Sequence, residues 1–260
     1  MLNSINDTTS QRALMASELT PLSVLREDFD RESVFQKQLD FLQKNGFSSV
    51  RRVRGDGDCF YRSFAFSFLE QLIDEPDREF AVMRRLSLLD GFEPSLKSAG
   101  FDKDTYQDFK EEFEECIKAF AQPDHTGRVM NLQSLVQVFQ DEMKSHAIVF
   151  YLRLITSMKI YEDQENMAPF LMNPETFDPM SPTSFRRRQI EVMGVEADEP
   201  QIIALTNAMK VNVEVAYVDG HTTSDIVKFV RIHNAQDENS RSIMLLYRPG
   251  HYDVLNRGKP

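Results

Sequence analysis

The hydrophobic periodicity of this chain changes near residue 210, and this change sets the fold class. Before it, apolar residues recur at helical spacing, as Phe35, Leu39 and Leu42 do within about 31–44. After it, residues 211–217 alternate between apolar and polar side chains, as a half-buried strand does. Helices followed by strands are typical of an α+β fold, here a helical region followed by a small, mainly antiparallel sheet.

Further helical patterns cover about 104–121 and 132–142. Asn45-Gly46 is expected to end the first helix, because glycine accepts the left-handed conformation common after a helix. Ser145 is expected to cap the helix that follows, because its hydroxyl can accept from an unpaired first-turn amide. The basic run 186–188 lies just beyond a proline-rich stretch and predicts a solvated face, with an acidic partner patch as the alternative.

The last third of the chain holds one more helix and the strands. Asp198 and Pro200 are expected to open a helix that ends near Met209. The Asp219-Gly220 turn predicts a hairpin into a strand at 226–232. Two further strands are expected, at 241–247 and at 252–255.

Composition excludes several classes of protein. The chain has 260 residues, with 41 acidic and 30 basic side chains and a net charge of −11. A nucleic-acid partner is not expected, because phosphate contacts need a basic surface. The apolar run 147–152 is far shorter than the roughly 20 residues that cross a bilayer, so no membrane partner is expected. Two cysteines form no disulfide framework, which favours the reducing cytoplasm, with the nucleus as a second location.

The first residues differ in character from the rest. Residues 1–26 are polar and mixed and show no sustained period, which predicts a mobile N-terminal arm. Residues 27–260 are then expected to form one domain that carries any catalytic site. The protein is expected to be a monomer.

Cys59 is the strongest candidate for chemistry. It follows the turn 55–58, Gly-Asp-Gly-Asp, and begins an aromatic-rich helix. A thiol at a helix N-terminus faces unpaired amides and the positive end of the helix dipole, which favour the thiolate. The same amides can stabilise an oxyanion. The alternative is a buried structural cysteine. This is the favoured interpretation of Cys116, because it lies beside Phe113 and Ile117 near the apolar face of its helix, with no glycine and no histidine nearby.

A cysteine nucleophile needs a base, and His251 is the best placed of the five histidines. It follows the Pro249-Gly250 turn and enters a strand two residues before Asp253. Residues two apart on a strand face the same side, so both side chains are expected to point at one cleft, with the carboxylate orienting the imidazole. The alternative is a surface histidine at a strand edge.

Cofactor sites are not expected. Gly55 and Gly57 lack the third glycine of a dinucleotide-binding turn, and no phosphate-binding loop follows. Asp56 and Asp58 lack further ligands at calcium-loop spacing, and the Cys and His spacings do not match a zinc site.

Four stretches resemble a known family. Residues 56–64, Asp-Gly-Asp-Cys-Phe-Tyr-Arg-Ser-Phe, resemble the nucleophile motif of the ovarian-tumour (OTU) cysteine proteases. Residues 245–255, Leu-Leu-Tyr-Arg-Pro-Gly-His-Tyr-Asp-Val-Leu, resemble the histidine motif of one branch, the otubains. Residues 150–157 and 202–205 also look otubain-like, and the likeness runs in order from about residue 30 to the C-terminus.

The resemblance implies a papain-like fold and a deubiquitinating thiol isopeptidase that needs no cofactor. Ubiquitin and polyubiquitin are the implied substrates, with chains that target proteins to the proteasome as the implied preference. It implies Cys59 as nucleophile, His251 as general base, Asp253 as the residue orienting His251, and Asp56 as part of the loop that forms the oxyanion hole.

The chain departs from the family at one position. Otubains usually carry Asn immediately before the nucleophile, and this chain has Asp58. A carboxylate there would either disfavour the thiolate by repulsion or pair with a nearby cation.

Two other functions stay open. The resemblance also implies binding to ubiquitin-conjugating (E2) enzymes, so the chain could act as a non-catalytic inhibitor of E2 enzymes through its arm and its surface. A cysteine hydrolase acting on a ubiquitin-like modifier is the third possibility.

Overall fold

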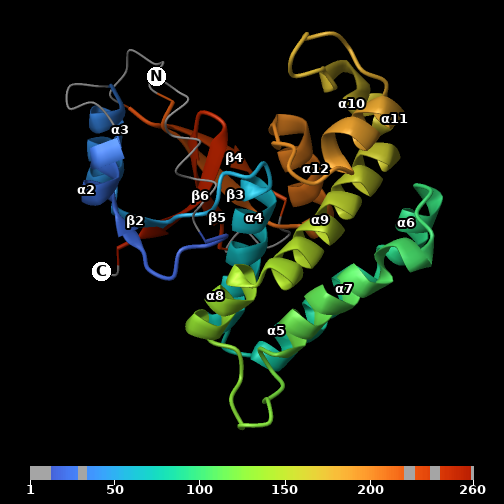
Figure 1. The fold of residues 1–260 in the computed structure, drawn as a ribbon, viewed down its shortest axis with the longest axis horizontal. Helices are drawn as coiled ribbons and strands as arrows, with labels where there is room; N and C mark the ends of the chain where they lie inside the picture. The colour runs from blue at the N-terminus through green and yellow to red at the C-terminus, as the bar shows by residue number, and fades with distance from the viewer. Residues whose placement is uncertain (1–12, 29–33, 220–225, 235–240, 259–260) are drawn as a thin grey trace.

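A six-stranded sheet separates a thin helical layer from a thick one in the computed structural model of the chain (Figure 1). The structure describes residues 13–28, 34–219, 226–234 and 241–258. In spatial order the strands are β1 (Thr20–Pro21), β2 (Phe47–Arg51), β6 (His251–Arg257), β5 (Ile243–Arg248), β3 (Val213–Tyr217) and β4 (Lys228–Ile232). Neighbouring strands are antiparallel except β3 and β5, which pair in parallel.

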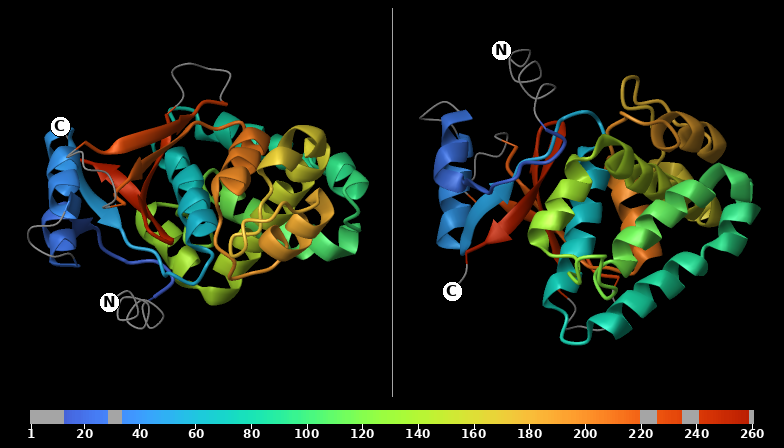
Figure 2. Two further views of the ribbon diagram at one scale, coloured as in Figure 1. Left: turned by 90° about the horizontal axis from the view of Figure 1, so that it is seen from above. Right: turned by 60° about the horizontal axis from the view of Figure 1, so that its bottom comes forward.

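Alternation along the strands supplies both layers with apolar side chains. Leu245 and Val254 belong to the large core, whereas Leu246 and Leu255 face the smaller core on the other side. The smaller core is closed by α2 (Leu22–Leu25) and α3 (Val34–Lys44). Both rotated views show these two helices on one face of the sheet and the remaining helices on the other (Figure 2).

The thick layer is built around α4 (Cys59–Glu70), which is almost wholly buried, and the long helix α9 (Glu142–Glu162), in which 12 of 21 residues are buried. The other helices pack around this pair. They are α5 (Arg78–Asp90), α6 (Glu93–Ser98), α7 (Lys103–Lys118), α8 (Leu132–Gln140), α10 (Gln164–Met167), α11 (Pro182–Phe185) and α12 (Glu199–Met209), with single turns η1 (Arg26–Asp28), η2 (Gln71–Asp74), η3 (Ala168–Phe170) and η4 (Arg186–Ile190). The expected α+β class is therefore confirmed. Within the described ranges, no helix is long and apolar enough to cross a membrane.

The expected helix ends are confirmed at two places. Gly46, with φ +84°, follows α3 as predicted. Asp198 caps α12 and accepts the Glu199 amide, as the sequence indicated. The predicted strands are found within two residues of their expected limits, and Gly220 of the predicted turn lies outside the described residues.

Three features of the sequence-based description need correction. The cap of α9 is Asp141, whose side chain accepts from the Lys144 amide, so the helix begins before Ser145. Ser145 lies one turn inside the helix and is fully buried.

The second correction concerns Arg186, which is buried. It donates to Ser157 Oγ at 2.8 Å and to the Ala99 carbonyl at 2.8 Å. The solvated face is therefore formed by the other two arginines of the run, which are exposed.

The third correction concerns the proposed arm. Residues 1–12 lie outside the described residues, but 13–26 are packed against the domain. Leu14 and Met15 are buried, and the backbone at 14–16 pairs with 52–54 just before the candidate nucleophile turn. Thr20 then pairs with Val50 at the sheet edge. The folded part of the chain therefore begins well before residue 27. The sequence did not indicate this, because the buried apolar residues are few within a mainly polar segment.

Candidate active site

Cys59 is the first residue of α4 and lies directly after a tight turn. Gly57 in that turn has φ +83°, and a Cβ there would lie 2.0 Å from the carbonyl oxygen of Gly194. Only glycine fits, because the backbones of the turn and of residue 194 touch. This close approach explains why a glycine precedes the candidate nucleophile by two positions.

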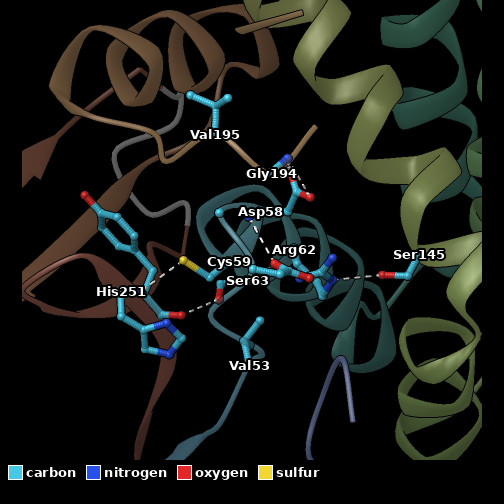
Figure 3. Close-up of polar contacts among 12 residues, drawn as sticks. Val53, Asp58, Cys59, Arg62, Ser63, Ser145, Gly194, Val195 and His251 are labelled. Atoms are coloured by element: carbon cyan, nitrogen blue, oxygen red, sulfur yellow. Dashed lines mark hydrogen bonds and ion pairs between the residues drawn. The ribbon is translucent and has the colours of Figure 1, made fainter. Parts of the chain in front are cut away.

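The Cys59 sulfur is buried and faces polar groups of β6. Its side chain is only 2% exposed, and the Tyr252 amide donates to Sγ at 3.4 Å (Figure 3). Ser63, one turn along α4, donates to the Tyr252 carbonyl at 3.3 Å and so fixes the strand against the helix. An amide aimed at the sulfur favours the thiolate, and the first amides of a helix have no intrahelical partner. The site can therefore hold a negative charge on sulfur.

His251 and Asp253 point to the same side of β6, as strand alternation predicted. His251 Nε2 and Asp253 Oδ1 are 2.9 Å apart. The other ring nitrogen, Nδ1, is buried and makes no hydrogen bond to any residue that the structure describes. Figure 3 shows the imidazole beside the Cys59 sulfur. The arrangement leaves Nδ1 as the atom that can exchange a proton with the thiol.

The Asp253 carboxylate is fully buried, and both of its oxygens accept hydrogen bonds. Oδ1 also accepts from the Val53 amide at 2.9 Å, and Oδ2 accepts from Arg248 Nη2 at 2.5 Å. Burial alone would raise the pKa of Asp253, but His251 and Arg248 hold this pKa well below its ordinary value of 3.8. The carboxylate is therefore ionised and rigidly held.

The same group controls His251. Burial alone would lower the pKa of His251, but the Asp253 carboxylate and the nearby Cys59 sulfur raise it well above its ordinary value of 6.5. A raised imidazole pKa favours the imidazolium that pairs with a thiolate. Cys116 shows the contrast: burial raises its pKa to about 12, and it lies in the large core as predicted.

Asp56 holds the turn from inside. Its Oδ1 accepts the Asp58 amide at 3.0 Å and Arg62 Nη1 at 2.9 Å. Arg62 is fully buried, and its Nε donates to Ser145 Oγ at 3.0 Å. The structure thus places Asp56 as a support of the turn, which leaves the Cys59 amide at the start of α4 to face a substrate oxygen.

Asp58, the departure from the family pattern, is paired with a cation. Arg153 of α9 donates to Asp58 Oδ1 from Nε at 2.9 Å and from Nη2 at 2.5 Å. Both side chains are almost completely buried. Of the two outcomes expected for a carboxylate at this position, pairing with a cation is the one found.

The sequence did not identify Arg153 or Arg248 as parts of the site. Arg153 reaches Asp58 from α9, 95 positions away, so no local spacing indicated that contact. Arg248 lies only five positions from Asp253, across the turn between β5 and β6. A signal existed for Arg153, which is the only charged residue between Ala147 and Met158, in a stretch that is otherwise apolar or weakly polar. Such a residue is normally paired when it is buried.

Among the described residues, no group of His, Cys, Asp and Glu is arranged to hold a metal ion.

Known proteins share this arrangement of sequence and fold. The Peptidase C65 Otubain family model matches residues 7–257. The human ubiquitin thioesterase OTUB1 is 31% identical over 245 residues, covering 93% of this chain and 82% of OTUB1. An Arabidopsis thaliana ovarian tumor domain-containing deubiquitinating enzyme is 32% identical, covering 90% of this chain and 78% of that enzyme.

Solved structures agree over the whole domain. A ceOTUB1 complex with ubiquitin aldehyde and UBC13~Ub matches with a TM-score of 0.83 at 26% identity, covering 100% of this chain and 99% of that one. A second complex, of h/ceOTUB1 with ubiquitin aldehyde and UBCH5B~Ub, gives a TM-score of 0.82 at 27% identity, covering 99% and 95% of the two chains. Because the otubain family model covers nearly the whole chain and the relatives match at 31–32% identity, this protein belongs to the Peptidase C65 otubain family.

Proposed function

We propose that the protein is a cysteine-type deubiquitinase that hydrolyses isopeptide bonds at the ubiquitin C-terminus. The observation that carries the proposal is the arrangement of Cys59, His251 and Asp253 at the N-terminus of α4. Relatives named as ubiquitin thioesterases, and solved relatives bound to ubiquitin aldehyde, support ubiquitin as the substrate.

Each residue of the site has a role in the proposed reaction. The Cys59 thiolate attacks the isopeptide carbonyl carbon, and amides at the start of α4 stabilise the oxyanion. His251, protonated through Nδ1, donates that proton to the leaving lysine amine and leaves a thioester on Cys59. Water, deprotonated by His251, then hydrolyses the thioester. Asp253 keeps the imidazole oriented throughout, and no cofactor takes part.

The direct test is cleavage of diubiquitin followed on gels. Wild type is expected to cleave it, and Cys59→Ala is expected to lose all cleavage. Cys116→Ala is the matched control, because it removes the other thiol, and it is expected to keep activity. A folded wild type that cleaves no diubiquitin linkage would refute the proposal, and cleavage by Cys59→Ala would move the nucleophile elsewhere.

Three finer features belong to the proposal. We expect a preference for the linkage that targets proteins to the proteasome, in a monomeric cytoplasmic protein. A panel of diubiquitins of all linkages, compared at equal enzyme concentration, measures the preference. A ubiquitin-like modifier cleaved faster than ubiquitin would instead favour the third function considered above.

Binding to ubiquitin-conjugating enzymes is the second candidate function. It is supported by the relatives solved together with UBC13~Ub and UBCH5B~Ub conjugates. If the chain restrains these enzymes by binding, Cys59→Ala will still slow ubiquitin-chain synthesis in a reconstituted reaction. If it acts only by hydrolysis, the same variant will have no effect.

A further inference from the structure

Two separate backbone segments meet behind Cys59, and both are held by one pair of side chains. The first segment is the turn 56–58. The second is 190–195, which runs from the end of η4 toward α12. Gly57 and Gly194 touch through their backbones. We define the Asp58–Arg153 pair, with the backbone groups that it binds, as the clamp.

Arg153 forms one half of the clamp, and all three nitrogens of its guanidinium donate hydrogen bonds. Besides binding Asp58, it donates to the carbonyls of Gly57 at 3.1 Å, Ile190 at 3.1 Å and Val195 at 2.6 Å. Its guanidinium also lies over the Tyr61 ring, 4.3 Å from the centroid. A planar fork of fixed geometry can meet all these acceptors at once, whereas a lysine ammonium cannot.

Asp58 forms the other half from the opposite side. Its two oxygens accept the Gly194 amide, at 3.1 and 3.2 Å, while Oδ1 holds Arg153. Figure 3 shows Gly194 and Val195 beside Asp58, next to Cys59. The segment then continues to Glu196, whose carboxylate would lie 3.3 Å from a Cβ at Gly250, the residue before His251. The clamp therefore fixes a wall that extends from the nucleophile turn to the base.

We propose that Asp58 and Arg153 are positioning residues for the oxyanion-binding turn, and that their joint role is geometric. The clamp holds the turn and the 190–195 segment in register, so that the amide of Cys59 meets the substrate oxygen. Because the two charges cancel, the carboxylate next to the nucleophile does not repel the thiolate. The inference rests on the proposed hydrolysis of ubiquitin conjugates and adds residues to that reaction.

Two reactions of Cys59 separate positioning from thiol activation. Turnover of ubiquitin carrying a fluorescent C-terminal amide passes through an oxyanion. Alkylation by iodoacetamide does not, because the thiolate forms an S–C bond at a saturated carbon and iodide leaves. A positioning residue should therefore affect the first reaction and spare the second. Peptide mass mapping distinguishes alkylation at Cys59 from alkylation at Cys116.

For Arg153→Lys, we expect kcat to fall at least about tenfold, with KM and the alkylation rate within about threefold of wild type. Asp58→Ala should behave in the same way. Asp58→Asn keeps an acceptor oxygen for Arg153 and should retain kcat within about threefold. Thermal melts show which variants fold, and the Asn variant keeps the test open if the other two do not fold.

Arg85→Lys is the matched control. Arg85 donates to the Phe68 carbonyl and lies over the Phe68 ring at the far end of α4, so its replacement removes a similar contact away from Cys59. Its kcat and alkylation rate should be unchanged.

The outcomes separate this inference from the proposed function. Parallel loss of turnover and alkylation in Arg153→Lys or Asp58→Ala would overturn the geometric role. So would unchanged turnover in both, or an Asp58→Asn loss as large as that of Asp58→Ala. A wild type that alkylates at Cys59 but turns over no ubiquitin amide would refute the proposed function instead.

Discussion

At the scale of single residues, the site depends on a carboxylate that is buried, ionised and satisfied. Asp253 accepts from the Val53 amide, His251 and Arg248. A buried carboxylate with such partners stays charged, because its hydrogen bonds and the nearby cations outweigh the cost of desolvation. Its ionisation in turn favours protonated His251. One side chain therefore sets the charge state of the pair.

This ionisation predicts a dependence of stability on pH. Because the pKa of Asp253 is lower in the folded than in the unfolded protein, it contributes stability above about 3.8 that is lost as pH falls below this value. Between pH 5 and pH 3, Asp253→Asn should lose about 1 kcal/mol less unfolding free energy than wild type does. Urea unfolding at both pH values measures the difference. Equal losses in the two proteins would contradict an ionised Asp253.

The residues of the site differ in how well sequence predicted them. Cys59, His251 and Asp253 were predictable because a turn before a helix and a two-residue strand spacing are local signals. The arginines that complete the site were not, because Arg153 is 95 positions from Asp58 in the chain. Arg153 becomes adjacent to Asp58 only when α9 packs against α4, whereas Arg248 meets Asp253 across the turn between β5 and β6, five positions away. Burial of a charged residue is the consequence of that packing, and sequence spacing does not record it.

At the scale of elements, α3, α7 and α8 followed from their local periodicity, whereas α5, α6 and parts of the sheet were not predicted. β2 is only five residues long and lies far in sequence from its partner β6. β4 follows β3 in the chain but lies at the edge of the sheet, so that β3 pairs in parallel with β5 on its other side. Such pairings are set by tertiary contacts, so the sequence patterns predicted β3 to β6 but neither β1 and β2 nor the order of the strands.

The start of α9 provides a prediction about two polar residues. Asp141→Ala should lower the unfolding free energy by about 1 kcal/mol, because it removes the cap, and should leave kcat unchanged. Ser145→Ala should reduce both, because it leaves the buried Arg62 Nε without its acceptor and so disturbs Asp56 in the turn. Denaturant unfolding and ubiquitin-amide turnover measure these effects. Full activity in Ser145→Ala would show that the link from Arg62 to the turn is not needed.

At the scale of the whole molecule, the N-terminal residues belong to the folded unit from at least Leu14 onward. Leu14, Met15, Leu22 and Leu25 are buried, and 14–16 pair with the backbone that leads into the catalytic turn. Each such side chain contributes about 1.5–3 kcal/mol when fully buried. The packing therefore couples the chain's beginning to the stability of its active site.

Two truncations test this coupling. Deletion of residues 1–26 should lower the melting temperature by many degrees and reduce hydrolysis, because it exposes both apolar cores. Deletion of residues 1–12 should leave the melting temperature and diubiquitin cleavage close to those of wild type. Differential scanning calorimetry with a cleavage assay compares the two proteins. Equal melting temperatures for both truncations would contradict the structural role of residues 13–26.

The central claim is that Cys59 is a reactive nucleophile in a site that accepts the ubiquitin C-terminus. The most direct measurement is reaction with ubiquitin that carries an electrophilic C-terminal group, followed by intact mass. Wild type is expected to gain the mass of one ubiquitin, and Cys59→Ala is expected to gain none while Cys116→Ala reacts as wild type does. A folded wild type that gains no adduct, or a Cys59→Ala protein that still does, would contradict the account.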